Sequence, residues 1–218
     1  MRNENKKTKE QKMEKTYLTL KETAKLLRAA LKKNFPGVKF SVRSESFAGG
    51  SAIRVSYTDG PLQKAVEKVV NCYAYGGFDG MIDLSFHVNH WMNEKTGEVV
   101  DASSGGTVNS GGLYESYEYG CPGEGWIKVS FGAKYVTVSQ HLSVQVLEEG
   151  LEMTAEKFKN GNMNFDSSLV KVVHSEYGSW INTEKLVEKC GWNSDIQFIN
   201  NKIHENAGLI SAGEYYNG

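Results

Sequence analysis

The sequence predicts an α+β fold, in which helices cover a mainly antiparallel sheet built from hairpins, with a small helical annex at the C-terminal end. Three observations predict this class. Apolar residues recur at helical spacing in three long segments, they alternate with polar residues in several short segments, and glycine-containing turns separate the short segments. The resulting order is helix, hairpin, helix, hairpin, strand pair and helix.

The first helix is predicted over residues 20–34. Thr19 and Glu22 form a capping-box pattern, and Pro36 disfavours helical geometry beyond Asn34. One face is apolar at spacings of three and four residues: Leu20, Ala24, Leu27 and Leu31. Beside it runs a basic stripe at the same spacing: Lys21, Lys25, Arg28 and Lys32.

A hairpin is expected to follow. Residues 38–43 and 53–57 alternate apolar and polar side chains, which is typical of half-buried strands, and a loop over 44–50 containing Gly49 and Gly50 joins them. Asp59 is the expected cap of the second helix, with Pro61 at its first turn. That helix has an apolar face at helical spacing: Leu62, Val66, Val69 and Tyr73.

The later elements are read in the same way. Residues 82–91 and 98–100 predict a second hairpin around a turn at 93–97, and residues 101–125 predict a long irregular excursion rich in Gly, Ser and Tyr. The predicted strand pair comprises residues 126–131 and 134–139, and a helix over 143–158 follows it. Two short helices are expected at about 183–190 and 194–205.

Composition sets the bounds on domains and function. The chain has 218 residues, 39% of them hydrophobic, and a net charge of −1, which excludes a protein that coats nucleic acid through overall charge. Residues 1–16 hold six Lys or Arg and almost no apolar side chain, so we expect a disordered basic tail, with a basic arm for nucleic acid as the alternative. The predicted organisation is this tail, an α+β domain over 17–159 and the annex over 160–218.

The three cysteines are scattered and form no CxxC pair, so neither a disulfide framework nor a structural zinc site is expected. This cysteine usage favours a reducing cytoplasm. The sequence has no run of 18 apolar residues, so no membrane span or membrane partner is expected. We expect no cofactor.

Several short motifs resemble the large polyvalent protein-associated domain 29 family, whose members occur in phage and other mobile-element proteins. The motifs span residues 17–143 and occur in the following order: Leu27-Arg28 with Leu31, Phe35-Pro36-Gly37, residues 39–43, Gly49-Gly50-Ser51, Asp59-Gly60-Pro61, residues 78–83, residues 131–136 and Ser143. The resemblance implies a mobile-element origin, and hence the cytoplasm of a bacterial host. It carries no catalytic mechanism to individual residues.

The first candidate site is a basic surface that could bind phosphates. It combines the stripe on the first helix with basic residues expected on the exposed strand face: Lys21, Lys25, Arg28, Lys32, Lys39, Arg43 and Arg54. Tyr57, Tyr73 and Tyr75 would add stacking wherever they are exposed. The competing interpretation is an ordinary solvated helix face.

The second candidate is a polar site at Asp79, Asp83, His87 and His141. Asp83 and His87 are four residues apart, so on one strand they would point the same way, whereas His87 and His90 would face opposite sides. No metal is expected from this spacing, and structural or surface histidines are the competing interpretation.

Two further candidates are weaker. Cys72, Cys121 and Ser143 could act as nucleophiles, but no local signature supports them. An aromatic loop could instead bind a partner or fold back as a lid, and it contains Tyr114, Tyr117, Tyr119 and Trp126.

The sequence therefore favours a non-catalytic binding protein of a phage or other mobile element. The expected partner is nucleic acid or a host nucleoprotein, in an anti-defence role. One alternative is a small hydrolase or nucleotide-processing enzyme using Asp83, His87 and His141. Another is a small-molecule sink closed by the aromatic loop.

Overall fold

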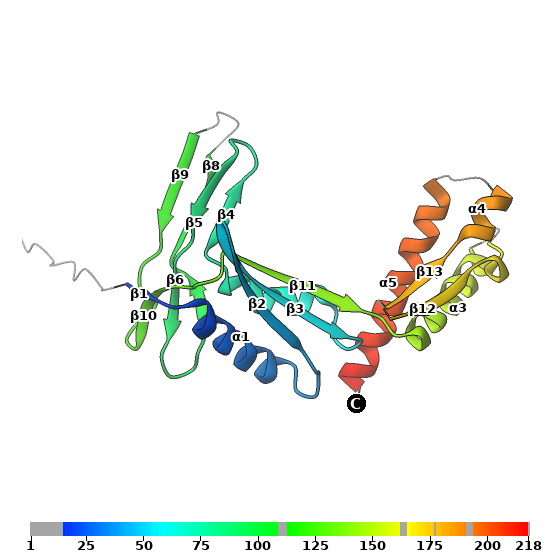
Figure 1. The fold of residues 1–218 in the computed structure, drawn as a ribbon, viewed down its shortest axis with the longest axis horizontal. Helices are drawn as coiled ribbons and strands as arrows, with labels where there is room; N and C mark the ends of the chain where they lie inside the picture. The colour runs from blue at the N-terminus through cyan, green and yellow to red at the C-terminus, as the bar shows by residue number, and fades with distance from the viewer. Residues whose placement is uncertain (1–14, 109–112, 162–164, 177, 191–193, 218) are drawn as a thin grey trace, which may run out of the picture. The chain divides into compact units, whose positions relative to one another are not determined.

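The computed structural model describes residues 15–108, 113–161, 165–176, 178–190 and 194–217 (Figure 1). Most of the predicted tail lies outside the described residues. The elements in chain order are β1 (Thr16–Tyr17), α1 (Leu20–Asn34), β2 (Ser41–Phe47), β3 (Gly50–Thr58), α2 (Gln63–Val70), the 3₁₀ helix η1 (Asn71–Tyr73), β4 (Gly76–Asp79), β5 (Leu84–His87), β6 (His90–Asn93), β7 (Val99–Asp101), β8 (Ser103–Val108), β9 (Leu113–Glu118), β10 (Trp126–Ser130), β11 (Tyr135–His141), α3 (Val144–Asn160), the 3₁₀ helix η3 (Ser167–Leu169), β12 (Lys171–Ser175), β13 (Gly178–Asn182), α4 (Glu184–Cys190) and α5 (Ser194–Asn217).

The predicted α+β class is confirmed. The strands form several small sheets, with orders β1-β10-β6-β7, β11-β3-β2, β12-β13, β4-β5 and β8-β9. Pairing is antiparallel in β10–β6, β6–β7, β4–β5, β8–β9 and β12–β13, and parallel in β1–β10.

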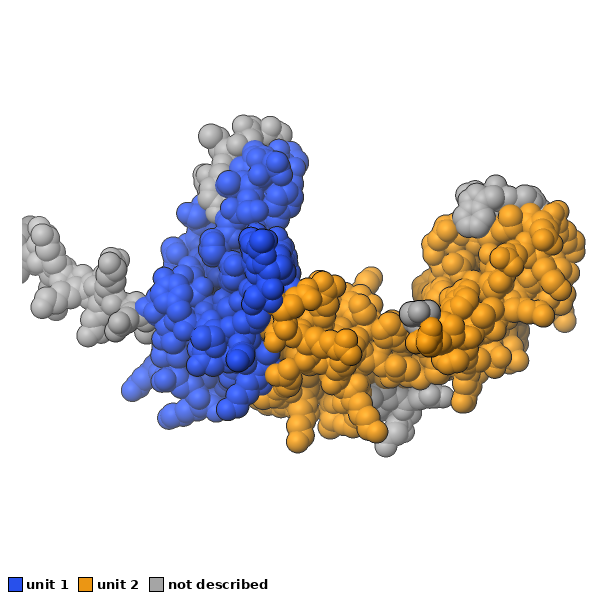
Figure 2. All heavy atoms as spheres, in the orientation of Figure 1, with its two compact units in different colours: residues 1–26, 46–52, 72–135 blue, residues 27–45, 53–71, 136–218 orange. Residues whose placement is uncertain are grey.

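The chain divides into two compact units, each assembled from separate stretches of sequence (Figure 2). Unit 1 comprises residues 1–26, 46–52 and 72–135, and unit 2 comprises residues 27–45, 53–71 and 136–218. The predicted boundary at 159/160 lies within unit 2.

Helix α1 forms as predicted. The backbone N–H and the hydroxyl of Thr19 both donate to Glu22 Oε2, at 2.8 and 2.7 Å, and Glu22 N–H donates back to Thr19 Oγ1 at 3.3 Å. This reciprocal pair satisfies the first free amides of the helix. The hydrogen bonds from Thr19 also lower the pKa of the Glu22 carboxyl. Leu27 and Leu31 are buried on the predicted apolar face.

The first hairpin is longer than predicted. Strand β2 continues to Phe47, so the prediction of a loop over residues 44–50 was wrong. Only two residues form the turn between β2 and β3, and one of them, Gly49, has a φ of 92°. In β3 the buried Ile53 and Val55 flank the exposed Arg54, which confirms the predicted alternation.

Asp59 does not cap α2, contrary to the prediction. Its φ is 55°, and its Oδ1 accepts the backbone N–H of Ser143 at 2.8 Å, just before α3 begins. Helix α2 starts at Gln63. Val66 is buried as predicted, while Val70 is buried in the last turn and Val69 is only half-buried.

Residues 82–91, predicted as one strand, form two. Strand β5 pairs with β4, a strand that the sequence did not predict, while β6 pairs with β7 as expected. The turn after β6 is also as predicted, because Asn93 Oδ1 accepts two backbone N–H groups at 3.0 Å.

Two other pairing predictions were wrong. The predicted excursion over 101–125 contains the paired strands β8 and β9. The predicted pair over 126–139 separates, because β10 joins β6 and β1 in one sheet while β11 joins β3 in another. Local alternation identified β10 and β11, but it carries no information on the strand with which each one pairs.

The C-terminal part contains a hairpin, β12–β13, that the sequence analysis did not foresee, beside helices α3, α4 and α5. Helix α5 is longer than expected. These elements share one apolar core in unit 2, with the following buried members: Val146, Leu147, Phe158, Val170, Ile181, Leu186, Ile196, Ile199, Ile203 and Ala207.

Candidate nucleic-acid interface

We call the seven cationic residues selected from the sequence the basic face. All of them are exposed: Lys21, Lys25, Arg28, Lys32, Lys39, Arg43 and Arg54. Four lie along α1 because successive spacings of four, three and four residues return to one side of a helix. The others lie on or beside β2 and β3. Apolar residues occupy the core positions of α1, so the four cations of this helix remain exposed to water.

Arg28 links the helix to the hairpin. Its Nη2 donates to the carbonyl oxygen of Val42 at 2.7 Å. This bond holds the guanidinium of α1 next to the strand that carries Arg43. Only one of the five N–H groups of the guanidinium is used in this bond.

Arg54 differs from the others because it already has a partner. Its Nη2 lies 2.5 Å from Glu45 Oε1 on β2, and both side chains are well exposed. Exposed ion pairs contribute little, about 0–1 kcal/mol, so an arriving phosphate could compete with Glu45. We therefore expect Arg54 to contribute less to anion binding than Arg43.

The basic face contains a shallow hollow of about 350 Å³ between α1 and β2. Its floor is apolar, with the rings of Phe35 and Phe40 6.0 Å apart, and Arg28 and Lys32 line it as cations. An anion with an attached apolar or planar group would match this lining.

Two of the three tyrosines expected to stack on bases are unavailable. Tyr57 is buried and its hydroxyl donates to the carbonyl of Pro61 at 2.8 Å. Tyr73 is also buried, its ring 5.0 Å from that of Phe131, and burial raises its pKa to about 12. Tyr75 is half-buried and stacks on His87.

The residues of the predicted polar site lie in different settings. Asp79 is at the end of β4, where it accepts hydrogen bonds from the Thr107 hydroxyl and the Met81 N–H, and the first of these lowers its pKa most. Asp83 is not on a strand as assumed; it lies in the turn with a φ of 53°. His141 ends β11 in unit 2.

Asp79 and His87 are also separated within their own hairpin. The register pairs Asp79 with Leu84 and His87 with Gly76, so the two lie three positions apart, on the order of 10 Å along the strands, and face opposite sides. Within the described parts of the chain, no three His, Cys, Asp or Glu side chains form a group that could hold a metal ion.

His90, which the spacing argument separated from His87, is buried in the structure. It is 2% exposed, and its Nε2 lies 3.4 Å from Asp101 Oδ1 on the neighbouring strand. Among the described residues, its Nδ1 is buried and has no hydrogen-bond partner. Burial lowers the pKa of His90 despite the opposing Asp101 carboxylate, so the ring is neutral.

The candidate nucleophiles have features that do not favour catalysis. Burial, with the Asp101 carboxylate, raises the pKa of the Cys72 thiol to about 11, which keeps it protonated at neutral pH. The Cys121 thiol is exposed and donates to the carbonyl of Gly123 at 3.2 Å. Ser143 caps α3, its Oγ accepting the Val146 N–H at 3.4 Å.

The aromatic residues predicted on a loop lie largely on strands. Tyr117 is exposed on β9, and Trp126 is half-buried at the start of β10. The Tyr119 ring is exposed, its hydroxyl 2.9 Å from Ser104 Oγ, while its carbonyl accepts Trp91 Nε1 at 3.0 Å. The side chain of Tyr114 lies outside the described residues.

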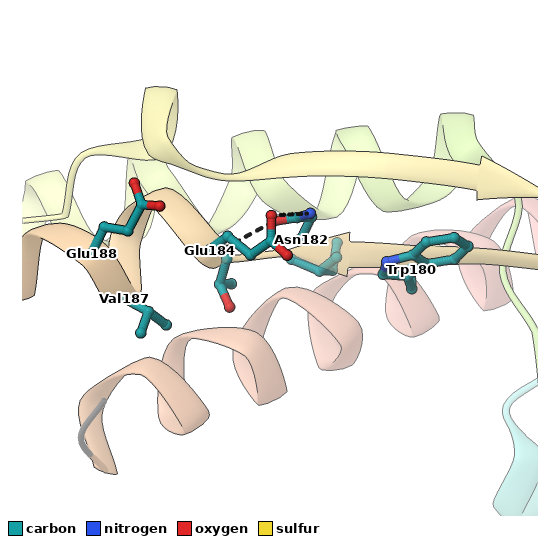
Figure 3. Close-up of a pocket in the computed structure, with 7 residues that line it drawn as sticks. Trp180, Asn182, Glu184, Val187 and Glu188 are labelled. Carbon is teal, nitrogen blue, oxygen red and sulfur yellow. Dashed lines mark hydrogen bonds between the residues drawn. The ribbon is translucent and has the colours of Figure 1, made fainter. Parts of the chain in front are cut away.

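A larger hollow of about 600 Å³ lies at β13 and α4 (Figure 3). Its charged residues are Glu184 and Glu188, and the first is held by Asn182, whose Oδ1 accepts the Glu184 N–H at 2.9 Å. Figure 3 shows Glu188, Glu184 and Trp180 one after another along the hollow, so their side chains do not point toward a common centre. Its negative charge would repel phosphate, so this hollow does not extend the basic face.

None of the helices in the described part of the chain combines the length and the apolar character needed to cross a membrane. No curated protein and no solved structure matched the chain. The family model of the large polyvalent protein associated domain 29 matches residues 18–143, which is more than half of the chain and includes α1, the first hairpin and the sheet strands up to β11. The chain therefore belongs to the large polyvalent protein associated domain 29 family and is a protein associated with phages or other mobile genetic elements.

Proposed function

We propose that this mobile-element protein is a non-catalytic binding protein that attaches to nucleic acid, or to nucleic acid within a host nucleoprotein, through the basic face. We place its action in the cytoplasm of the bacterial host, in an anti-defence role. The observation that carries the proposal is the exposure of all seven cationic side chains on α1, just before β2 and on the β2–β3 hairpin.

The distribution of charge favours this function over non-specific electrostatic binding by the whole chain. The whole chain has a net charge of −1, so the basic face is a local feature. The apolar positions of α1 and β3 are buried, so these cations lie on the solvent-exposed sides of their own elements. Binding through such a surface releases counterions from the phosphates and weakens as salt rises.

Arg28 is a well-suited phosphate contact. Its bond to the Val42 carbonyl restricts the side chain before any ligand arrives, which reduces the ordering entropy lost on binding. The remaining N–H groups can still form a fork to phosphate oxygens.

The test is binding of labelled single- and double-stranded DNA and RNA across a salt series, measured by fluorescence anisotropy. We expect tight binding at low salt with a steep negative slope. The variant Lys25→Glu/Arg28→Glu/Arg43→Glu should lose most affinity. Each phosphate contact removed should reduce the slope of log K against log salt by about 0.9 for duplex DNA and about 0.7 for a single strand.

A second variant, Lys21→Glu/Lys25→Glu/Lys32→Glu, keeps the Arg28–Val42 bond. A loss of affinity in this variant would therefore come from the changed charge and not from the loss of that bond. The matched control is Lys64→Glu/Lys68→Glu/Lys185→Glu, which makes the same charge change at exposed lysines on α2 and α4. Equal weakening by the control and by the basic-face variants would contradict a specific role of the basic face. Absence of binding at low salt by the unaltered chain would refute the proposal.

A further inference from the structure

A third hollow lies in unit 1 and is lined by residues of β4, β5 and the start of β11. It has a volume of about 470 Å³, within the range of small-ligand sites. We call it the aromatic pocket, because five of its ten lining residues carry rings. The lining comprises Gly49, Tyr75, Gly76, Gly77, Phe78, Ser85, Phe86, His87, Lys134 and Tyr135.

Two glycines allow the walls of this pocket to approach one another. A Cβ on Gly77 would lie 2.2 Å from the Phe86 ring, and a Cβ on Gly76 would lie 2.5 Å from the carbonyl oxygen of Lys134. No side chain fits at either position. The backbone of β4 therefore packs directly against Phe86 and the start of β11.

The rings are arranged as a stacking surface. Tyr75 and His87 are stacked, with centroids 4.8 Å apart and planes within 3° of parallel. His87 and Tyr135 are exposed, and Phe78 is 63% exposed. Exposed rings at a pocket offer faces on which another planar ring can stack.

A cation lies at the same pocket. Lys134 Nζ donates to the Gly49 carbonyl at 3.3 Å and lies 5.3 Å from the centroid of the Tyr135 ring. Among the described residues, no carboxylate lies within ion-pair distance of this ammonium. Its charge is thus available to an anionic group next to the aromatic surface.

We infer that the aromatic pocket binds a nucleotide, its base stacked on the exposed rings and its phosphate beside Lys134. Planar rings select a base, and the unopposed ammonium selects a ligand that also carries negative charge. An aromatic peptide side chain would leave the ammonium without a partner. We expect the bound nucleotide to be part of single-stranded nucleic acid, and this form of the inference rests on the proposed function. A free mononucleotide offers the same base and phosphate, and its binding would not depend on the proposed function.

The experiment compares labelled oligothymidylate, duplex DNA and the mononucleotides dTMP and AMP, using anisotropy for the polymers and titration calorimetry for the mononucleotides. The pocket variants are His87→Ala, Tyr135→Ala and Lys134→Gln. Each should weaken oligothymidylate binding about tenfold, in the range measured for loss of one stacked base. Duplex binding and the thermal unfolding midpoint should not change.

The chain offers a matched control for the lysine–tyrosine pair. Lys15 Nζ lies 4.7 Å from the centroid of the Tyr17 ring, which is 74% exposed, and neither residue lines the pocket. Tyr17→Ala and Lys15→Gln should leave oligothymidylate binding within about twofold of the unaltered chain. A gap-filling variant, Ser85→Trp, should block the pocket without removing any ring.

The outcomes separate this inference from the proposed function. Loss of polymer binding in the basic-face variants together with retained dTMP or AMP binding supports a pocket that works independently. Binding of mononucleotides by a chain that binds no polymer supports the pocket with a free nucleotide as its source, while the proposed function fails. The inference is overturned if the unaltered chain binds neither mononucleotides nor oligothymidylate, or if the pocket variants bind oligothymidylate as tightly as the control variants.

Discussion

Gly150 of α3 faces Ala207 of α5 so closely that a Cβ on residue 150 would lie 2.6 Å from the Cβ of Ala207 and 2.8 Å from its backbone nitrogen. Real side chains essentially never approach so closely, so this helix pair requires glycine at position 150. The contact brings the two helices together at the core of unit 2 that they share.

The first prediction concerns this contact. Gly150→Ala should reduce the free energy of unfolding by about 1–3 kcal/mol, because the new methyl group overpacks the interface. The loss would occur although alanine is intrinsically better than glycine in a helix by about 1 kcal/mol. Urea unfolding followed by circular dichroism would measure it.

The matched control is Gly213→Ala on α5, where a Cβ would meet nothing within 4 Å. This variant should be neutral or more stable, by up to about 1 kcal/mol. Similar stabilisation by both substitutions would show that the two helices are not in close contact at Gly150.

The second prediction concerns a buried polar pair near that contact. Asn206 Nδ2 donates to Thr154 Oγ1 at 2.8 Å, and the Thr154 hydroxyl donates to the Gly150 carbonyl at 2.7 Å. Thr154→Val should cost about 1–3 kcal/mol because it leaves the Asn206 amide buried without this acceptor. In a double-mutant cycle with Asn206→Leu, the two losses should sum to more than the loss in the double variant. Simple additivity in urea unfolding would indicate that the pair is not coupled.

The third prediction concerns a hydroxyl that connects α1 to the segment after β10. Thr23 is fully buried, its Oγ1 accepts the Gly132 N–H at 2.8 Å, and its hydroxyl donates to the Thr19 carbonyl at 2.9 Å. Thr23→Val should lower the free energy of unfolding by about 1–3 kcal/mol, because the Gly132 amide loses its acceptor. Thr23→Ser keeps the hydroxyl and should retain more stability. An equal loss in both variants would assign the effect to packing.

The fourth prediction is a pH dependence from His90. Burial holds its folded-state pKa below the ordinary value of 6.5, so between those two values the unfolded chain binds more protons than the folded one. Stability should therefore fall as pH drops below 6.5, by at most about 1.4 kcal/mol per pH unit for this one group.

Urea unfolding at a series of pH values would measure this dependence, and His90→Gln should flatten it. An unchanged slope in His90→Gln would show that the ring is already accessible to protons in the folded state.

Local patterns identified much of the first half of the fold. The capping box of Thr19 and Glu22, the helical spacing of α1 and the alternation around Arg54 involve residues that are neighbours in sequence, so their geometry follows from a few adjacent residues. The exposure of the basic stripe followed for the same reason, because a buried apolar face leaves the opposite side of the helix in water.

Gly76 and Gly77 lie within strand β4, although glycine normally weakens a strand. The turn to β5 takes the four residues 80–83, because Asp79 ends β4 and pairs with Leu84. The structure gives a reason for the two glycines, which is close packing against Phe86 and the backbone of Lys134.

The sequence by itself determined α1, α3 and the strands of the first hairpin, the apolar faces of these elements, and the exposure of the cations of the basic face. The tertiary structure decided that β10 and β11 join different sheets, that Asp59 supports α3 instead of capping α2, and that Tyr75, His87 and Lys134 line one pocket. Periodicity reports only whether a residue faces the core, because it arises from the repeat of a single element. Partner choice depends on packing and hydrogen bonds between segments far apart in the chain, and no local pattern encodes them.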